Sequence, residues 1–283
     1  MMKLITPIIL CLFMAHNAFS QAAPAPVGVQ LYSYREQFKK DVRGTFQRIK
    51  DLGIKELEVG GFYDLSPQDF KKTLDEFGLT ALGVGVGFDI LEDDKQLMKT
   101  IENAHIIGAK YIMCSWIPHV EGGFTLAECQ RAITAFNKAG KLLKNNKLGF
   151  LYHPHGYEFR PYKDAYLMDL MMSETKPEYV NYEMDINWVF HAGHNPVTWL
   201  KKYPKRWQAM HVKDRKQGTP CNQFGRMDVE TNVAIGQGEV NVADIMTTAI
   251  KLGIKYYFLE DESSRSFEQT PPSMDYLRPF FKK

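Results

Sequence analysis

The chain has 283 residues, of which 45% are hydrophobic and 24% charged, a balance that excludes an intrinsically disordered protein. This length is ample for one large domain with a buried core. The formal net charge is only +2 at pH 7, so electrostatic binding to nucleic acid or to an anionic membrane is not expected.

The first 20 residues have the pattern of a secretory signal peptide. Lys3 supplies the positive start, Leu4 to Met14 form the apolar centre, and residues 18–20 (Ala-Phe-Ser) have the small-x-small form of a cleavage site. The apolar run is too short to span a bilayer. We therefore expect a periplasmic or secreted protein with no membrane span, a disordered leader at 21–26 and one domain at 27–283.

The predicted mature chain contains three cysteines, Cys114, Cys129 and Cys221. An odd number without CxxC spacing argues against a disulfide framework or a zinc ribbon. One disulfide remains open in an oxidising compartment, and the sequence does not say which two cysteines would form it.

From residue 27 onward, patterns typical of buried strands alternate with patterns typical of amphipathic helices. The predicted strands lie at 27–34, 54–60, 81–88, 111–115, 148–152, 180–185, 209–212 and 256–260. The clearest predicted helices lie at 41–52, 125–145, 162–173, 196–203, 242–252 and 267–280, with two more ending at Gly78 and Gly108.

A recurring phrase supports this division of the chain. Leu-Gly-Ile-Lys at 52–55 returns at 252–255, with looser echoes at 77–78, 107–108 and 148–149. Each is interpreted as a helix C-terminal glycine that leads into a strand. The eight predicted strands, each followed by a helical or loop segment, predict a parallel α/β fold, and the length suits a single closed (β/α)8 TIM barrel. A doubly wound open sheet is the alternative, but the turn after the first strand lacks a glycine-rich dinucleotide fingerprint.

Residues 148–159 (Leu-Gly-Phe-Leu-Tyr-His-Pro-His-Gly-Tyr-Glu-Phe) place His153, His155 and Glu158 directly after a short apolar strand. The two histidines point the same way if the extended path continues, and Pro154 then ends the ladder because it has no N–H. Two imidazoles and a carboxylate at the mouth of a strand suit metal binding or acid/base catalysis. Solvated loop residues remain the alternative.

In a TIM barrel the catalytic residues lie at the C-terminal ends of the strands. Here these ends carry Glu58, Cys114, His153, Asp185, His211 and Glu260, followed closely by Lys213, Asp214 and Asp261. Asp185, His211 and Glu260 come from consecutive strands and should converge. Such a mixed oxygen and nitrogen set suits one divalent ion, such as Mn²⁺, Zn²⁺, Co²⁺ or Mg²⁺. Alternatively, His211 is a core histidine, Glu260 pairs with Lys213, and Glu58 is a structural acid.

Several phrases, taken in order, resemble the sugar phosphate isomerase/epimerase superfamily with its xylose isomerase-like TIM barrel. They are residues 28–33 (Gly-Val-Gln-Leu-Tyr-Ser), 152–159 (Tyr-His-Pro-His-Gly-Tyr-Glu-Phe), 182–189 (Tyr-Glu-Met-Asp-Ile-Asn-Trp-Val), 211–214 (His-Val-Lys-Asp), 236–240 (Gly-Gln-Gly-Glu-Val) and 258–261 (Phe-Leu-Glu-Asp). They cover nearly the whole predicted mature chain. The resemblance is nearest to the inosose dehydratase-like and ketose 3-epimerase-like members, here in an exported form.

The resemblance implies a metal site. In the epimerase members, Glu, Asp, His and Glu from strands five to eight hold one divalent ion, and Asp185, His211 and Glu260 match the last three. His153 takes the place of the first glutamate, with Glu158 as a second candidate nearby. The inosose dehydratase-like members resemble this chain in carrying histidines here. Because the epimerases move protons with two metal-bound glutamates, this departure argues against a two-glutamate epimerisation.

We therefore expect a metal-dependent isomerase or epimerase that removes the proton next to the carbonyl of a sugar or keto-sugar. A lyase or dehydratase acting on 3-keto-glycosides or inososes would share that first step. A non-catalytic sugar-binding protein is the alternative from another class. Glu158, Glu260 and His155 are the predicted catalytic residues. We expect Glu158 to reach from its loop towards the substrate and His155 to orient it.

The predicted substrate contacts are Glu58, Trp188, Lys213 and Arg215. Arg215 begins the longest connection, residues 215–241, which we expect to form a lid or a wall of the substrate site. A mobile surface loop is the alternative for this segment. The predicted export signal favours an unphosphorylated sugar over a sugar phosphate.

Overall fold

The computed structural model describes residues 27–120 and 122–282, so the predicted signal peptide (1–20) and leader (21–26) lie outside the described residues. Its central strands are β1 (Gly28–Gln30), β2 (Glu56–Val59), β3 (Thr80–Val86), β4 (Tyr111–Cys114), β5 (Gly149–Tyr152), β8 (Asn181–Asp185), β9 (Trp207–Val212) and β12 (Tyr256–Leu259). They are parallel and close into a barrel in the order β1, β12, β9, β8, β5, β4, β3, β2. The predicted (β/α)8 TIM barrel is therefore confirmed.

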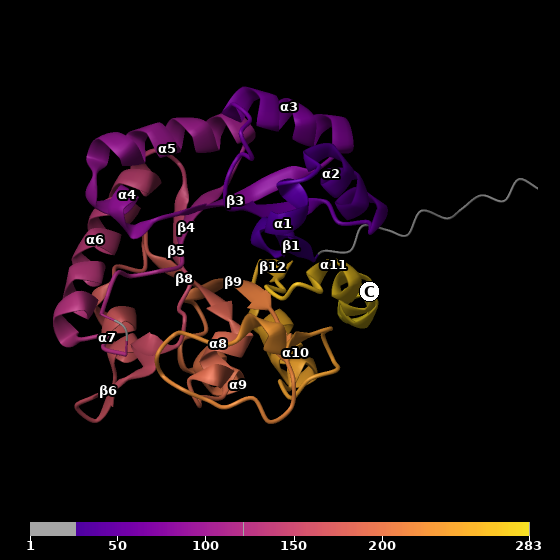
Figure 1. Cartoon of the computed structure of the whole chain (residues 1–283). Coiled ribbons are helices and arrows are strands. Elements are labelled where there is room, and N and C mark those ends of the chain that lie inside the picture. The colour runs from indigo at the N-terminus through magenta and orange to yellow at the C-terminus, as the bar shows by residue number, and fades with distance from the viewer. Residues whose placement is uncertain (1–26, 121, 283) are drawn as a thin grey trace, which may run out of the picture.

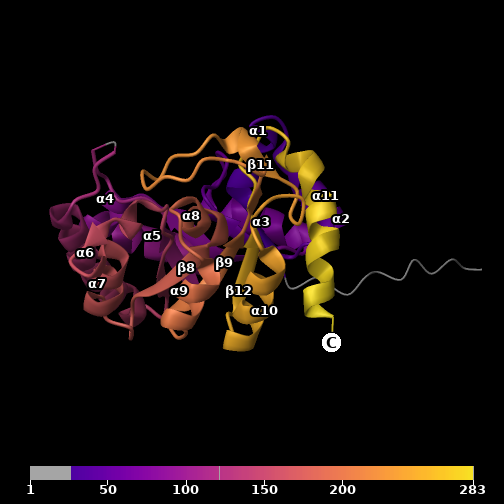
Figure 2. The same ribbon diagram turned by 90° about the horizontal axis from the view of Figure 1, so that it is seen from below.

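Helices surround the barrel (Figure 1). They are α1 (Arg35–Phe38), α2 (Val42–Asp51), α3 (Pro67–Phe77), α4 (Phe88–Glu92), α5 (Asp94–Ile107), α6 (Leu126–Asn145), α7 (Leu167–Glu174), α8 (Ile186–His191), α9 (Pro196–Lys202), α10 (Val242–Leu252) and α11 (Ser266–Leu277). Figure 2 shows α9, α10 and α11 along the outside of the barrel. None of the helices in the described ranges combines the length and apolar character needed to cross a bilayer.

The helix-ending glycines are confirmed at four of the five predicted places. Gly53, Gly78, Gly108 and Gly253 all follow helices and have φ between 69° and 80°, a conformation that glycine adopts without steric cost. The fifth, at 148–149, is wrong, because the left-handed residue after α6 is Lys147, with φ of 63°.

Two apolar layers stabilise the fold. The larger lies between the strands and the helices, and the smaller fills the inside of the barrel with Leu82, Tyr111, Met113, Leu151, Ala209 and Phe258. Gly83 is required beside this inner layer, because a Cβ there would clash with the ring of Tyr111. The inner layer forms an apolar floor below the C-terminal ends of the strands.

Two local predictions were wrong. The first strand ends at Gln30 and continues as a 3₁₀ helix, η1 (Leu31–Tyr34), in which the Gln30 side chain accepts a hydrogen bond from the Tyr32 N–H. The helix predicted at 162–173 begins only at Leu167, after a hairpin of β6 (Pro161–Tyr162) and β7 (Ala165–Tyr166). Helices α1, α4 and α8 were not predicted. All three cysteines of the described chain are free.

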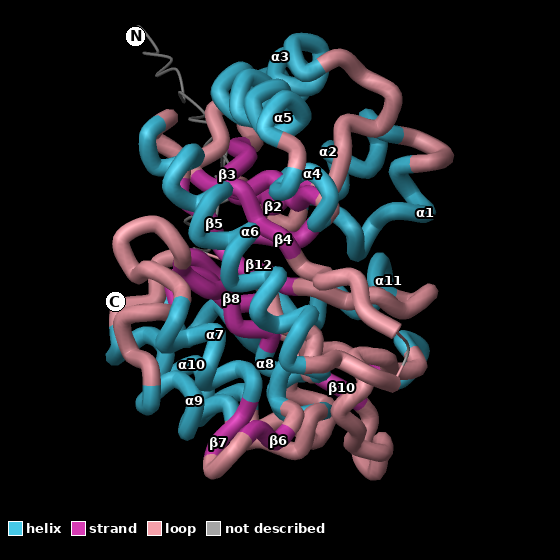
Figure 3. Tube along the Cα trace, turned by 90° about the vertical axis from the view of Figure 1, so that its left-hand side faces the viewer, coloured by secondary structure: helices cyan, strands magenta, loops and turns pink. Residues whose placement is uncertain are grey.

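The first residues of the long connection after β9 form hydrogen bonds that hold its later part in place. Asp214 accepts hydrogen bonds from the backbone N–H groups of Gly236 and Gly238, both at 2.9 Å, and of Val240 at 3.1 Å. Strand β10 (Asp214–Arg215) pairs with β11 (Asn232–Val233), and the 3₁₀ helix η3 (Val229–Thr231) precedes β11. Figure 3 shows β10 among loops on one side of the molecule. The segment is therefore anchored at both ends.

Candidate active site

Polar side chains face inward directly above the apolar floor. Ala209 of β9 belongs to that floor, and His211 follows two residues later. Likewise, Leu151 of β5 belongs to the floor, and His153 follows two residues later, just after the end of β5. Alternate residues of a strand share a face, so both histidines point into the barrel. Asp185 of β8 pairs in register with His211. The alternation of the strands therefore brings imidazoles and carboxylates together at one level.

Four buried side chains, those of His153, Asp185, His211 and Glu260, converge at the C-terminal end of the barrel. Each offers one ligand atom, and these four atoms all lie within 4.8 Å of one another. Nδ1 of His211 is 3.0 Å from a Glu260 oxygen, and Nε2 of His153 is 3.6 Å from an Asp185 oxygen. The fold thus gathers the four residues that were predicted as metal ligands.

The chemistry of this cluster fits a divalent ion. Both ring nitrogens of His153 and the Oδ2 of Asp185 are buried without a hydrogen-bond partner. Buried polar atoms are normally hydrogen-bonded. Nitrogen and carboxylate oxygen atoms that face one another without hydrogen bonds, the Asp185 oxygen having only an ion pair with Lys213 at 3.2 Å, are typical of cation ligands. Two imidazoles and two carboxylates can hold any of the four divalent ions named above.

Lys213 lies beside the cluster and is fully buried. Its Nζ is 3.2 Å from Asp185, 2.8 Å from Glu260 and 2.6 Å from Glu262. Burial opposes ionisation of Asp185, but Lys213 and His153 hold the pKa of this carboxyl well below its usual range. Lys213 therefore keeps the Asp185 carboxylate ionised and holds it in place beside Glu260.

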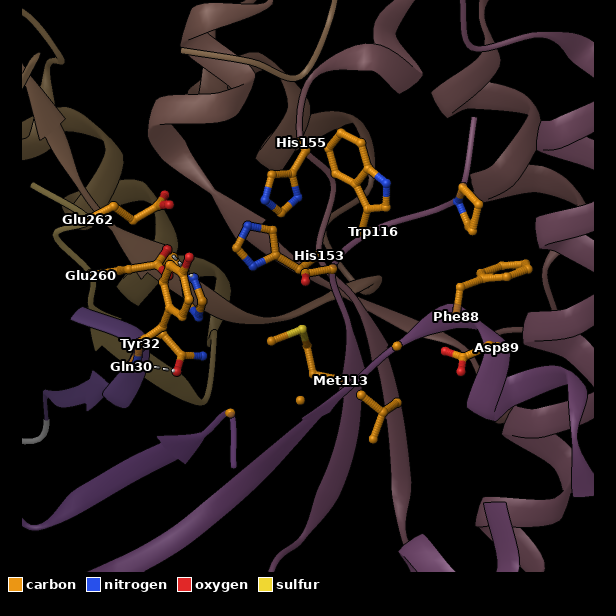
Figure 4. A pocket seen from close by; sticks show the side chains of 17 residues that line it. Gln30, Tyr32, Phe88, Asp89, Met113, Trp116, His153, His155, Glu260 and Glu262 are labelled. Atoms are coloured by element: carbon orange, nitrogen blue, oxygen red, sulfur yellow. Dashed lines mark hydrogen bonds and ion pairs between the residues drawn. The ribbon is translucent and has the colours of Figure 1, made fainter. Parts of the chain in front are cut away.

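A cavity of about 710 Å³ opens above the cluster (Figure 4). Its lining residues are Gln30, Tyr32, Gly60, Gly85, Val86, Gly87, Phe88, Asp89, Met113, Ser115, Trp116, Pro118, His153, His155, His211, Glu260 and Glu262. Figure 4 shows Glu260 and Glu262 entering from one side, with Phe88 and Asp89 on the other. The cavity is large enough to hold a small-molecule substrate above the four clustered side chains.

His155 lines this cavity, as a predicted catalytic residue should. Its ring stacks on that of His153, with the centroids 4.7 Å apart, and its buried Nδ1 has no hydrogen-bond partner. Burial lowers the pKa of His155 to about 3, so the imidazole is neutral near pH 7. A neutral ring can donate a hydrogen bond to a substrate or accept one from it.

Glu158 does not lie where the sequence analysis places it. Its buried carboxylate accepts hydrogen bonds from the Tyr152 hydroxyl and from the backbone N–H groups of His155, at 3.1 Å, and Gly156, at 2.9 Å. The 3₁₀ turn η2 (Tyr157–Phe159) folds the side chain back beneath its own loop. The expectation that Glu158 reaches the substrate is therefore wrong, because its carboxylate supports the loop that carries His155.

We expect Glu158→Gln to change stability more than chemistry. The glutamine amide replaces an acceptor oxygen with a donor that faces N–H groups, which should lower the free energy of unfolding by about 1–3 kcal/mol. Urea denaturation measures this loss, with the exposed Glu178→Gln as the matched control. Loss of turnover in a Glu158→Gln protein of unchanged stability would restore Glu158 as a catalytic group.

None of the four predicted substrate contacts lines the cavity. Glu58 lies below the cluster, 2.8 Å from Nε2 of His211. Trp188 is buried beside His155, with the ring centroids 5.0 Å apart. Lys213 forms ion pairs with the carboxylates of Asp185, Glu260 and Glu262.

Arg215 was wrongly predicted to contact the substrate. It is fully buried and binds Glu239 at 2.8 Å, and its guanidinium lies 2.7 Å from Nδ1 of His191. In the sequence, an arginine close to the C-terminal end of a strand is a plausible substrate contact. In the fold, Arg215 instead binds Glu239, which lies 24 residues further along the chain. No residue of 215–241 lines the cavity, so this segment does not form the predicted substrate wall.

Two acids of the site, Glu183 and Glu262, were not predicted from the sequence. Glu183 precedes Asp185 by two residues on β8 and faces the same side, so strand alternation could have identified it. Its oxygen lies 3.2 Å from Nε2 of His211. Glu262, two residues after Glu260, lines the cavity from a loop. No periodic signal identifies a loop residue of this kind.

Comparisons with known proteins agree with the barrel fold. A profile of the family described as "Xylose isomerase-like TIM barrel" matches residues 46–280. An inosose dehydratase of Geobacillus kaustophilus is 25% identical over 189 residues, which are 60% of this chain and 61% of that protein. The chain spans about three-fifths of the length of the curated relatives it matches.

Solved structures share the fold. A sugar phosphate isomerase/epimerase from Parabacteroides distasonis has a TM-score of 0.78 at 23% identity, over 93% of this chain and 99% of that one. The IOLI protein with a bound zinc atom has a TM-score of 0.70 at 13% identity, over 89% of this chain and 95% of that one. At these identities the likeness establishes the barrel.

Proposed function

The chain belongs to the xylose isomerase-like TIM barrel family, and we propose that it is a metal-dependent enzyme that removes the proton next to the carbonyl group of a sugar or cyclic polyol ketone. The convergence of His153, Asp185, His211 and Glu260 at the floor of a cavity is the observation that carries this proposal. A divalent ion held by these residues would supply Lewis-acid stabilisation for negative charge on the carbonyl oxygen.

Two residues are assigned to proton transfer. Glu260 lines the cavity, and Lys213 fixes its carboxylate at 2.8 Å, so Glu260 is the proposed proton acceptor. His155 is the proposed hydrogen-bond partner of a substrate hydroxyl or leaving group, because its free Nδ1 belongs to a residue that lines the cavity. A positioned acid or base of this kind contributes about 10²–10⁴-fold to a reaction rate.

The proton-transfer groups lie on one side of the cavity. His155 and Glu260 come from the β5 and β12 side, and the one acid that the described lining has on the β2 to β4 side is the exposed Asp89, which Figure 4 shows across the cavity from Glu260. Epimerisation removes a proton from one face of a carbon and returns it to the other, so it needs groups on both sides. Aldose–ketose isomerisation returns the proton on the face from which it was taken, and a syn elimination removes the proton and the leaving group from one face. A base on the Glu260 side is therefore enough for either reaction.

The cavity lining supports a neutral substrate. It contains no lysine or arginine among its described residues, and such cations are the usual partners of a phosphate group. Tyr32 and Trp116 provide aromatic faces that suit an uncharged ring. An unphosphorylated substrate also agrees with the proposed export of the protein.

Elimination, as in a dehydratase or lyase, is the reaction that we place first. The similarity to inosose dehydratases supports this choice over isomerisation, which remains the second candidate. In elimination Glu260 would accept the proton beside the carbonyl and return it to the oxygen that leaves the neighbouring carbon as water or an alcohol, while the N–H of the neutral His155 ring donates a hydrogen bond to that oxygen.

Product analysis in deuterated water tests this proposal. The protein would be incubated with ketoses, inososes and 3-keto-glycosides, with Mn²⁺ or with a chelator. We expect a metal-dependent unsaturated product. Asp89→Asn, which alters the exposed carboxylate on the other side, should change the rate by no more than about twofold, whereas Glu260→Gln should abolish turnover. If the unchanged protein formed a deuterated epimer and the Asp89→Asn variant did not, Asp89 would be a second proton-transfer group and the one-sided arrangement would be contradicted. Substrate binding without any deuterium exchange would indicate a sugar-binding protein.

A further inference from the structure

A second layer of buried carboxylates lies directly behind the two histidines of the cluster. Glu58 and Glu183 are both fully buried. Nε2 of His211 is 2.8 Å from a Glu58 oxygen and 3.2 Å from a Glu183 oxygen. The same Glu183 oxygen lies 3.6 Å from Nδ1 of His153.

Glu58 already has a full set of partners. Its carboxylate accepts hydrogen bonds from Gln30 Nε2 at 2.6 Å and from the Tyr111 hydroxyl at 2.9 Å. Nε2 of His211 makes a third contact, to the same Glu58 oxygen that Gln30 contacts. An imidazole nitrogen carries a single N–H, so the Nε2–H of His211 belongs to Glu58, the closer and better fixed carboxylate.

Glu183 has no such set. Neither of its oxygens has a hydrogen-bond partner, although an unpaired carboxylate is costly to bury. Because His211 donates to Glu58, the donor that remains for Glu183 is the Nδ1–H of His153. A small rotation of either side chain would bring this 3.6 Å contact to hydrogen-bond length.

We propose that Glu183 is a positioning residue for His153: it accepts the Nδ1–H and so keeps Nε2 directed towards Asp185 and the metal. Each of the two histidines of the metal-ligand cluster then has its own carboxylate, Glu58 behind His211 and Glu183 behind His153. A carboxylate behind a metal-ligating imidazole fixes the tautomer and ring orientation. The inference rests on the metal site of the proposed function, and it assigns a role to an acid outside the ligand set.

A double-mutant cycle with His153→Glu tests this role. A carboxylate in place of His153 has no N–H to donate, so Glu183 would repel it instead of orienting it. Four full-length proteins would be compared: the unchanged chain, Glu183→Gln, His153→Glu and the double variant. The probes are Co²⁺ and Mn²⁺ alone. Chelator competition measures affinity, and the visible absorption of Co²⁺ reports on the geometry of its ligands.

We expect Glu183→Gln to weaken metal affinity by about 10–100-fold in the chain that carries His153, with a changed Co²⁺ spectrum. In the His153→Glu background the same substitution should leave affinity unchanged or increase it. An equal loss in both backgrounds would show that Glu183 only supports the fold and would overturn the proposal. Unchanged affinity in the His153 background would overturn it as well.

Two further variants keep the test decisive. Glu58→Gln is the matched control, because it acts through His211 and should weaken affinity equally in both His153 backgrounds. If Glu183→Gln does not fold, Glu183→Asp serves in its place, since aspartate keeps the acceptor at a greater distance. Failure of the unchanged chain to bind Co²⁺ or Mn²⁺ would refute the metal site itself, whereas normal binding that Glu183 variants leave unaltered would refute this inference alone.

Discussion

His211→Ala should lose the divalent ion and nearly all turnover. The substitution removes one of the four clustered ligands and also leaves Glu58 and Glu260 without the imidazole that lies between them. Lewis-acid stabilisation contributes several kcal/mol to such a reaction, so kcat/KM should fall by about 10³-fold or more. Metal content per chain, measured after dialysis, should fall from about one to near zero.

The matched control is His194→Ala. His194 is a partly buried histidine that packs on Phe159 and Trp199, away from the cluster. This variant should keep its metal and its turnover. Full metal content in a triple alanine variant of Asp185, His211 and Glu260 would show that the ion binds elsewhere.

Lys213→Met should cause the largest loss of stability. The substitution removes a cation that lies within 3.2 Å of Asp185, Glu260 and Glu262. Removing one partner from a buried ion pair costs about 3–5 kcal/mol, because the other charge remains buried. Urea denaturation of the metal-free protein should show a loss of this size, and Mn²⁺ should restore part of it by binding the folded state.

The surface pair of Lys202 and Asp169 provides the control for this prediction. The two groups are 2.6 Å apart, but the Lys202 side chain is 46% exposed. Lys202→Met should therefore cost no more than about 1 kcal/mol. Similar losses for both variants, or no rescue of Lys213→Met by Mn²⁺, would contradict the role given to Lys213.

The cluster was predictable because strand periodicity and the family resemblance agreed. Strand periodicity placed His153, Asp185, His211 and Glu260 at strand ends, and the chemistry of the last three suited one ion. The resemblance then assigned the fourth ligand position to His153. Glu183 could have been found from the same alternation, since it shares a face with Asp185.

The errors arose where local backbone geometry or distant partners decide the outcome. Gly156 adopts φ of 99° and the next residues form a 3₁₀ turn, which redirects Glu158 away from the cavity. Arg215 is buried because Glu239 and His191 lie beside it in the fold. The first strand is short because Gln30 caps a 3₁₀ helix. None of these features has a periodic signal in the sequence.

The most direct test of this account is a crystal structure of the Mn²⁺-loaded protein with anomalous scattering data. The account predicts one strong anomalous peak per chain, bound by His153, Asp185, His211 and Glu260, with Glu58 and Glu183 behind the two imidazoles. A peak bound instead by Glu58, Glu183 and Nε2 of His211, or no peak within the barrel, would contradict it.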